Sequence, residues 1–327
     1  MDGWSKSVRK TCAGVLALAV LLRLGGSSPK AVEPKAETAS FLMYLATGRA
    51  GIYEPVQPTE PVLAVPEETP MPRRIVFTAE QAQELRVKYG TAARPDLEKL
   101  LTQPVSLDFS GEEPRILIVH THATESYTPE PGWEYEASGN YRTLDENYNM
   151  IRVGERIADA LNAAGIPTLQ AKDYNDYPSY NDSYDRALEV IRGYLAEYPS
   201  IQMVIDVHRD AVENADGSQV GTAFSMDGKD TAQLLLVMGS DEGSLSHPDW
   251  EKNLSWALKL QVMLGEEDGE LARPLSLRPA RYNEHATPGS ILLEVGTAGD
   301  TLQEALNAAD AFAEALIDTI EGLGLRE

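Results

Sequence analysis

The chain has few basic residues and a single cysteine. Of its 327 residues, 28 are Lys or Arg and 51 are Asp or Glu, which gives a formal net charge of −23. This balance argues against nucleic acid as a partner, because nucleic-acid binding needs clustered cations that displace counterions from phosphates. Cys12 is the only cysteine, so an intrachain disulfide and a cysteine-based metal site are both excluded. Any bound metal must be held by histidine and carboxylate.

The N-terminal region lacks an apolar run long enough to span a bilayer comfortably, which takes roughly 20 residues. Three basic residues precede the apolar run Ala13–Leu22. No small-x-small cleavage site is evident before Ser27. The pattern therefore predicts a retained signal anchor or transmembrane segment over residues 1–27, with a cleaved signal peptide as the alternative. In either case the rest of the chain is expected to be extracytoplasmic.

Residues 28–112 are predicted to form a Pro/Glu-rich stalk with short helices. Six prolines lie among Glu and Thr between Glu54 and Pro72. Such a composition favours extended conformations and resists the formation of a core. Short helices are expected within this stalk at Ser40–Thr47 and Ala79–Tyr89.

Residues 113–327 alternate between short apolar runs and amphipathic segments. Strands are predicted at Ile116–Val119, Thr168–Ala171, Met203–Val207, Gln233–Met238 and Ser290–Val295, and helices at Asn149–Ala164, Tyr184–Glu197, Trp250–Leu264 and Thr301–Gly322. This alternation predicts an α/β domain with a mostly parallel, twisted sheet and helices on both faces.

Polar, titratable residues follow three of the predicted strands. His120 and His122 close the first strand, His208 closes the third and Glu294 closes the last. Ligands of open α/β sheets bind beyond the carboxyl ends of the strands, so these four groups are expected to converge there. His120 and His122 are two residues apart on a strand and should face the same side. A single histidine in such a place is more often a hydrogen-bonded structural residue, but the four together favour a site.

The remaining candidates have equally good structural explanations. His247 and His285 lie in polar loops and are expected at the surface, with His285 the better placed to touch a substrate. Glu125, Asp145 and Glu146 lie between the first strand and the first helix of this domain. Acidic residues there serve equally well as helix caps or first-turn charges.

Several strings of residues resemble motifs of one known family. The string His120–Tyr127, with the sequence HTHATESY, closely resembles the hallmark of the stage II sporulation protein P family. Other strings resemble further motifs of that family, in the family's order: Phe41–Leu45, Arg152–Glu155, Asp206–Asp210, Arg281–Asn283 and Pro288–Gly296. The resemblance covers about residues 115–327 with specific motifs, and the N-terminal region only in its layout.

The resemblance implies an amidase-like fold (phosphorylase/hydrolase-like) and a zinc-dependent N-acetylmuramoyl-L-alanine amidase. Members of the family hydrolyse septal peptidoglycan during engulfment in sporulation, and endopeptidase activity is also attributed to them. They act with other membrane-associated sporulation proteins of the engulfment complex. Expected partners are therefore peptidoglycan, those proteins and the membrane, through the N-terminal segment.

The resemblance also assigns roles to individual residues. His122 and His208 match zinc ligands, and Glu294 matches the catalytic glutamate. Glu125 is chosen as the third ligand because it lies inside the hallmark. The alternatives for this ligand are Asp145, Glu146 and Asn147, the last being the residue that alignment from the helix-start Asn149 places there.

The implied chemistry is metal-assisted amide hydrolysis. Zinc lowers the pKa of a bound water to about 7, and Glu294 acts as the base. Residues expected to contact the ligands, the oxyanion or the substrate are His120, Arg209, Arg281, Tyr282 and Asn283. Two rival functions remain open: a degenerate amidase domain that binds peptidoglycan as a scaffold for partner hydrolases, and a zinc peptidase that cuts only cross-links.

Overall fold

The computed structural model describes residues 74–136, 138 and 140–326. The predicted anchor over residues 1–27, the stalk up to residue 73 and the helix expected at Ser40–Thr47 lie outside the described residues. Within the described part, no helix is both long enough and apolar enough to cross a membrane.

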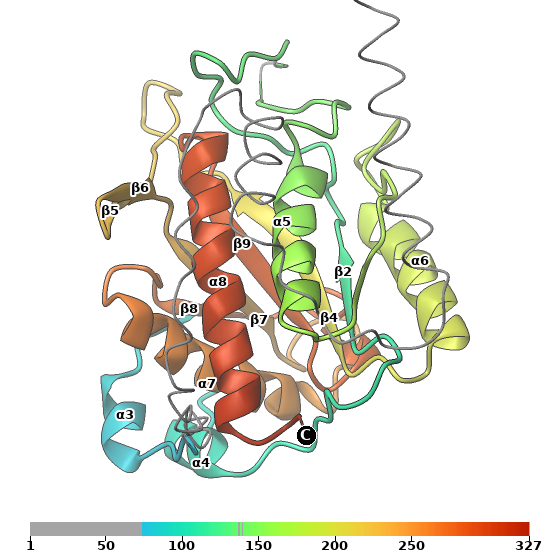
Figure 1. Ribbon diagram of the computed structural model, residues 1–327, viewed down its shortest axis with the longest axis vertical. Helices are drawn as coiled ribbons and strands as arrows, with labels where there is room; N and C mark the ends of the chain where they lie inside the picture. Colours follow the sequence, from blue (N-terminus) through green and yellow to red (C-terminus); the bar gives the residue numbers. More distant parts are fainter. Residues whose placement is uncertain (1–73, 137, 139, 327) are drawn as a thin grey trace, which may run out of the picture. The chain divides into compact units, whose positions relative to one another are not determined.

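A seven-stranded sheet forms the centre of the fold (Figure 1), with the strand order β1-β8-β7-β9-β4-β2-β3. Neighbouring strands pair in parallel except for β7 and β9, which are antiparallel. The strands are β1 Val87–Tyr89, β2 Ile116–Val119, β3 Thr168–Gln170, β4 Met203–Asp210, β7 Leu234–Gly239, β8 Leu275–Arg278 and β9 Ile291–Thr297. The predicted mixed α/β architecture with a mostly parallel sheet is therefore confirmed.

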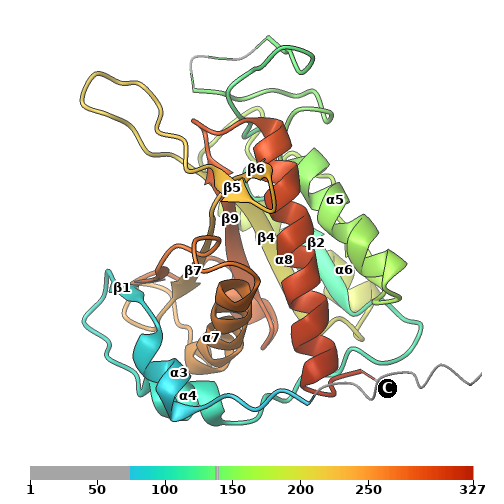
Figure 2. The same ribbon diagram turned by 60° about the vertical axis from the view of Figure 1, so that its left-hand side comes forward.

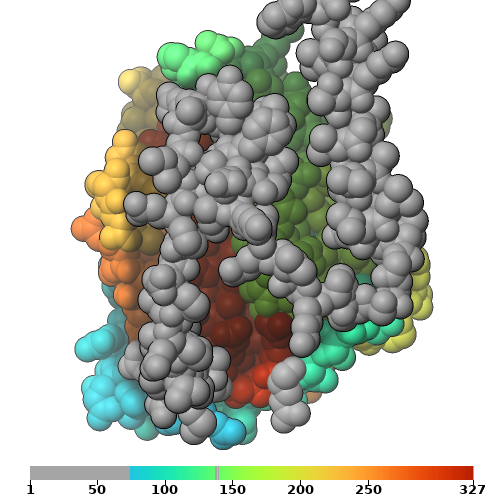
Figure 3. Space-filling view, in the orientation of Figure 1, coloured from blue at the N-terminus to red at the C-terminus, as the bar shows by residue number. Residues whose placement is uncertain are grey.

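Helices cover both faces of the sheet (Figures 1 and 2). Ile116 and Ile118 of β2 share the larger core with α5 (Met150–Ala163), α7 (Trp250–Glu267) and α8 (Leu302–Gly322). Leu117 and Val119 point to the opposite face, where they pack with Ile191 of α6 (Ser183–Glu197). Side chains alternate along a strand, so β2 is buried on both faces and is apolar throughout. In the space-filling view, the atoms of α5 and α8 adjoin each other (Figure 3).

The helix starts follow from capping residues in the sequence. Asn149 precedes α5, and its side chain accepts a hydrogen bond from Ile151 N (3.0 Å). Thr301 precedes α8 and forms a capping box with Glu304. A separate two-stranded hairpin, β5 (Phe224–Met226) and β6 (Lys229–Thr231), contacts α8.

Part of the predicted stalk belongs to the folded unit. Residues 74–112 contain α3 (Ala79–Glu84), β1 and α4 (Leu97–Thr102), and they bury Phe77, Leu101 and Phe109 in the larger core. The stalk prediction over residues 28–112 is therefore wrong from Arg74 onward, because apolar residues in this stretch fill the core and β1 adds an edge strand beside β8. The helix expected at Ala79–Tyr89 ends at Glu84, and β1 follows it.

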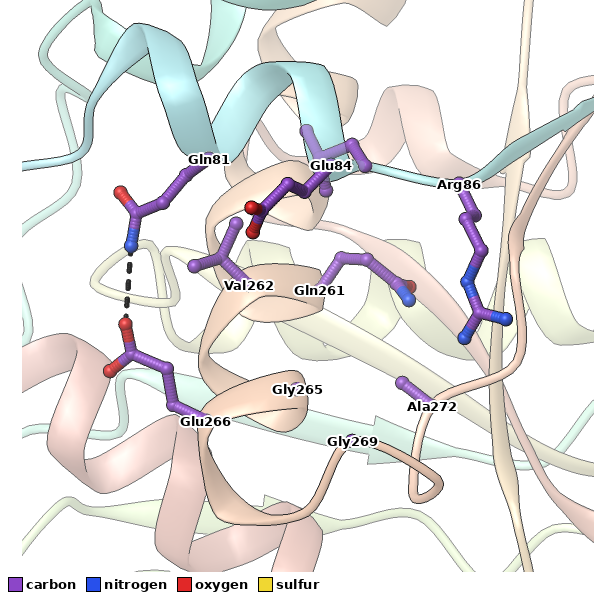
Figure 4. Close-up of a pocket in the computed structure, with 10 residues that line it drawn as sticks. Gln81, Glu84, Arg86, Gln261, Val262, Gly265, Glu266, Gly269 and Ala272 are labelled. Carbon is purple, nitrogen blue, oxygen red and sulfur yellow. Dashed lines mark hydrogen bonds between the residues drawn. The ribbon is translucent and has the colours of Figure 1, made fainter.

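This N-terminal segment covers the outer side of α7, and eleven residues of α7 are buried. A helix buried all round needs a partner on each side, and α4 provides the outer one. Lys259 Nζ and Ser255 Oγ both donate to Leu100 O, at 3.0 and 2.7 Å. Gln81 of α3 donates to Glu266 of α7 (3.1 Å) beside a cavity of about 320 Å³ between the two helices (Figure 4).

Candidate functional site

Three strands bring the candidate residues to one edge of the sheet. His122 and Glu125 lie in the turn that follows β2, while His208 lies inside β4 and Glu294 inside β9. β4 and β9 are neighbours, and His208 pairs with Glu294 in register. The carboxyl ends of parallel strands meet at one edge, which is why residues distant in sequence gather there.

His122, Glu125 and His208 form a buried cluster. The two imidazole rings are 5.1 Å apart between centroids and nearly perpendicular, at 89°. Glu125 Oε2 lies 3.6 Å from His208 Nδ1. Only 5% of His122, 6% of Glu125 and 3% of His208 is exposed, so water hardly reaches any of the three.

Asp206 joins this cluster, although no role for it was predicted from the sequence. Its Oδ1 lies 3.0 Å from His208 Nε2, in a position that lacks hydrogen-bond geometry. Thr121 donates to Asp206 from both its backbone N (2.8 Å) and its Oγ1 (2.6 Å). The position of Asp206 beside His208 could have been predicted from the sequence, because the two residues are two apart on a strand and therefore share a face.

Arg142 fixes the other oxygen of Glu125. Its Nη2 lies 3.0 Å from Glu125 Oε1, and its Nη1 lies 2.6 Å from Asp176 Oδ2 and 3.1 Å from Thr124 Oγ1. The carboxylate of Glu125 is thereby turned so that Oε2 faces His208. Arg142 comes from the loop before α5, and nothing in its sequence context marked it out.

Burial and neighbouring charges shift the pKa values of the cluster. Burial, with the nearby charge of His208, lowers the pKa of His122 to about 4. Burial pushes the pKa of Glu125 upward, but the close approach of the charged His208 ring outweighs it and lowers the pKa to about 2. Burial also opposes the charged form of His208, yet Asp206 and Glu125 raise its pKa well above the usual value. An ion pair among buried groups is the physical result.

Glu294 is in a different electrostatic position from Glu125. Burial raises the pKa of Glu294 to about 8, against the opposing charge of His208. Its Oε2 is buried and has no hydrogen-bond partner. A carboxyl that is easily protonated therefore lies on β9, directly across from His208 on β4.

His120 does not share the side of the sheet that His122 faces, so that prediction is wrong. β2 ends at Val119, and the following residues form a turn in which strand alternation no longer applies. His120 Nδ1 lies 3.2 Å from Val207 O, and its Nε2 lies 2.9 Å from Gln170 Nε2. Its ring packs under α5 against Gly154.

Replacing Gly154 with alanine should destabilise the fold, although alanine is the better helix former. A Cβ at residue 154 would lie 2.5 Å from His120 Cε1, which forces the buried ring to move. Overpacking of this kind costs about 1–3 kcal/mol. Gly193→Ala in α6 is the matched control, because a Cβ there meets nothing within 4 Å and should stabilise by about 0.5–1 kcal/mol. Urea unfolding of both variants would measure the difference, and equal shifts would show that His120 is not held in this way.

Two tyrosines line the cluster. The Tyr180 ring stacks on His122 with centroids 4.5 Å apart and an interplanar angle of 16°. Tyr184 meets His122 edge-on at 5.6 Å and lies nearly parallel to His208 at 6.3 Å. Tyr180 belongs to the loop between β3 and α6, and Tyr184 belongs to the first turn of α6; neither lies in a motif recognised in the sequence.

Arg209 contacts the proposed ligand Glu125 through its backbone, whose N donates to Glu125 Oε2 (3.4 Å). Its guanidinium donates to three backbone carbonyls of the loop before α5, namely those of Ser126, Asn140 and Tyr141 (2.7–3.2 Å). These bonds tie the loop to β4.

The loop Arg281–Asn283 lies beside the cluster through Tyr184. Tyr282 and Tyr184 are 5.9 Å apart between ring centroids, and Asn283 Nδ2 donates to Tyr184 O (2.7 Å). Tyr282 and Asn283 both have positive φ, 46° and 61°. A cavity of about 270 Å³ opens between this loop, the start of α6 and the loop after β7. Arg281 Nη1 donates to Ser246 O (3.3 Å).

The three alternatives to Glu125 as a ligand are solvent-exposed. Asp145 accepts hydrogen bonds from Asn147 N and Nδ2 in a turn before α5, and Glu146 lies exposed between them. The structure therefore brings Glu125, and not these residues, beside the histidines. His247 was expected at the surface but is fully buried, and its ring faces His285 at 6.5 Å.

The donors at the cluster suit a zinc ion in their chemistry. Zinc is held by imidazole nitrogen and carboxylate oxygen, and the cluster offers two imidazoles and the carboxylate of Glu125. His122 Nδ1 and His208 Nε2 are both buried without a hydrogen-bond partner. As the side chains lie, however, no group of three or more His, Cys, Asp or Glu in the described part of the chain could hold a metal ion. Metal binding there therefore requires these side chains to reorient.

Fold and site together define a mixed α/β protein with a buried imidazole–carboxylate cluster at the carboxyl edge of its sheet. The model of the stage II sporulation protein P family matches residues 58–317, so the chain belongs to that family. Over 261 residues it is 25% identical to stage II sporulation protein P of Bacillus subtilis (strain 168). That match covers 76% of this chain and 61% of the relative, so the chain spans about three-fifths of the relative's length.

Two solved structures align with part of this chain. One is an N-acetylmuramoyl-L-alanine amidase from Clostridium difficile 630, with 14% identity, a TM-score of 0.38 and coverage of 64% of this chain and 96% of that one. The other is the amidase AmiC2 of Nostoc punctiforme, with 14% identity, a TM-score of 0.36 and the same coverages.

Proposed function

We propose that the chain is a peptidoglycan hydrolase that cleaves the N-acetylmuramoyl-L-alanine amide during sporulation. The observation that carries the proposal is the meeting of His122, Glu125 and His208 at the carboxyl edge of the sheet, with Glu294 directly across from His208. Membership of a family named for sporulation supports the biological setting.

In this proposal His122, Glu125 and His208 hold zinc, and Glu294 moves the proton. A bound zinc ion would polarise the scissile carbonyl and acidify a water molecule. Glu294 takes the proton of the attacking water and passes it to the departing L-alanine amine. Arg142 keeps Glu125 Oε2 turned towards the histidines, and Asp206 orients His208.

The anchor predicted over residues 1–27 belongs to the same proposal. It would hold the domain outside the membrane, where peptidoglycan and the other membrane-associated proteins of engulfment are found. Because the net charge of −23 gives no attraction to an anionic polymer, anchoring would supply the local concentration that electrostatics does not.

A scaffold that binds peptidoglycan without cleaving it is the second candidate. The observation that favours it is the lack, among the described residues, of a ready group of three metal-binding side chains. The two functions differ in whether covalent bonds of the polymer are broken.

Mass spectrometry of purified sacculi incubated with the zinc-supplemented full chain separates the candidates. Release of free stem peptides is the result expected for an amidase. Unlinked muropeptides that keep their stem peptides would instead indicate a peptidase that cuts cross-links. Binding without soluble products would establish the scaffold and refute hydrolysis. A parallel digestion in chelator shows whether any product depends on metal.

A further inference from the structure

The cluster is too well covered for a substrate to touch it as it stands. Exposures of 3–6% leave His122, Glu125 and His208 almost without solvent contact. A molecule that reaches His122 must therefore displace a neighbouring side chain. The aromatic rings that contact His122 besides that of His208 belong to Tyr180 and Tyr184 among the described residues.

Tyr184 is held from several sides. It lies within the first turn of α6, its ring contacts those of His208 and Tyr282, and its backbone O accepts from Asn283. Moving Tyr184 would therefore disturb the helix start and the loop after β8 together.

Tyr180 is held only on one side. It lies outside every helix and strand, and 57% of it is exposed. Within the described part of the chain, its ring stacks on His122 and lies beside the guanidinium of Arg142, whose Cζ is 5.1 Å from the centre of the Tyr180 ring. Neither contact is a hydrogen bond. The Tyr180 ring can therefore rotate away without leaving a buried polar group short of a hydrogen-bond partner.

The backbone around Tyr180 is anchored. Asp176 accepts from Thr124 and Arg142, and Asn175 Nδ2 donates to His120 O (3.1 Å). Arg186 of α6 donates to the carbonyls of three residues of this loop: Asn175, Ser179 and Asn181. Rotation of the Tyr180 side chain is therefore the smallest movement that uncovers His122.

We propose that Tyr180 is the access-determining residue of this site: its ring covers His122, and it must rotate outward before a substrate can approach the cluster. Aromatic stacking of this kind favours the covered state by about tenfold, which corresponds to about 1.4 kcal/mol. This rests on the proposed function for the identity of the substrate, but the covering of His122 can be measured without it.

Acylation of histidines by diethyl pyrocarbonate, read residue by residue by mass spectrometry, tests the proposal on the full chain. We expect His122 to react slowly in the wild type and about ten times faster in Tyr180→Ala. Tyr180→Phe keeps the ring and should behave as the wild type. Tyr177→Ala is the matched control, since Tyr177 lies on the same loop, is 55% exposed and makes no ring contact with the cluster.

His208 serves as an internal control, because Tyr184 and not Tyr180 lies over its ring. Its reactivity should not change in Tyr180→Ala, and Tyr180→Leu provides a second variant without an aromatic ring should the alanine variant not fold. An unchanged rate at His122 in both ring-free variants, or an equal rise in Tyr177→Ala, would overturn the proposal. Digestion of sacculi in parallel tests hydrolysis separately from the covering of His122. If no products appear but His122 of Tyr180→Ala is acylated faster, the hydrolase proposal is refuted and the role of Tyr180 stands.

Discussion

Glu294→Gln should lower the turnover of muramoyl-alanine amide bonds by about 10²–10⁴-fold, the usual contribution of a general base. Glutamine keeps the shape of the side chain but cannot accept a proton. Glu294 pairs in register with His208, and its buried Oε2 has no hydrogen-bond partner that would compete for a proton. The measurement is the initial rate of stem-peptide release from sacculi at saturating substrate.

The control for this variant is Glu270→Gln, which removes an equivalent charge from an exposed turn residue away from the cluster. Zinc content should remain near that of the wild type in Glu294→Gln if His122, Glu125 and His208 hold the metal. Full activity of Glu294→Gln would remove its catalytic role. Loss of zinc together with activity would instead make Glu294 a ligand, and the mechanism would then lack its base.

The same substitution should raise stability at alkaline pH. The pKa of Glu294 is raised to about 8, so the folded state holds a proton that the unfolded chain releases near its ordinary value. Stability from this group is therefore present at low pH and is lost as pH rises through about 8. In chelator, Glu294→Gln should melt above the wild type at pH 9 and close to it at pH 5. A lower midpoint at pH 9 would show that the ionised carboxylate is stabilised by its neighbours.

The sequence predicted most of the central sheet because its strands are short apolar runs. β2 occupies the expected residues, and α5 and α8 begin after the caps Asn149 and Thr301. β1 and β8 were missed, because a polar residue interrupts the apolar residues of each short strand: Lys88 in β1 and Ser276 in β8. The β5–β6 hairpin carried a readable signal, because Asp227 and Gly228 both adopt the positive φ that such turns require.

The site was predictable only where a histidine or a glutamate comes after a run of apolar residues. His122, His208 and Glu294 each follow an apolar run, and the structure gathers them at one edge. Arg142 and Tyr180 could not be found in this way, because they reach the cluster from loops whose paths depend on tertiary contacts. The end of the stalk was placed wrongly for a related reason. The Pro-rich composition stops at Pro72, and it gives no information about the residues that follow, among which Phe77 and Leu101 fill the core.

His208→Ala should destabilise the metal-free protein by about 3–5 kcal/mol near neutral pH, the usual cost of removing one partner from a buried ion pair. Glu125 Oε2 and Asp206 Oδ1 lie 3.6 and 3.0 Å from the His208 ring, and all three side chains are buried. Without the imidazole, two buried carboxylates face each other across the gap. Urea unfolding in chelator measures this cost without any contribution from zinc.

His122→Ala is the matched comparison, because His122 is similarly buried but forms no ion pair within 4 Å with any residue that the structure describes. The His122→Ala substitution should lower the free energy of unfolding only through lost packing and the lost stack on Tyr180. The stack contributes about 0.5–1.5 kcal/mol. If both histidines hold zinc, both variants lose the metal, yet only His208→Ala is strongly destabilised in its absence. Similar unfolding energies for the two variants would show that His208 does not carry the charge that Glu125 and Asp206 need.

The pH dependence of this difference has a definite sign. The pKa of His208 is raised, so its contribution is fully present below the unfolded value and is lost as pH rises through the raised one. The pKa of Glu125 is lowered to about 2, so its contribution is present above its unfolded value and is lost as pH falls towards about 2. The gap between wild type and His208→Ala should therefore be widest between the ordinary pKa of a glutamate and that of a histidine. It should shrink towards acid pH, because protonated Glu125 no longer needs a cation, and a gap that widened there would contradict the ion pair.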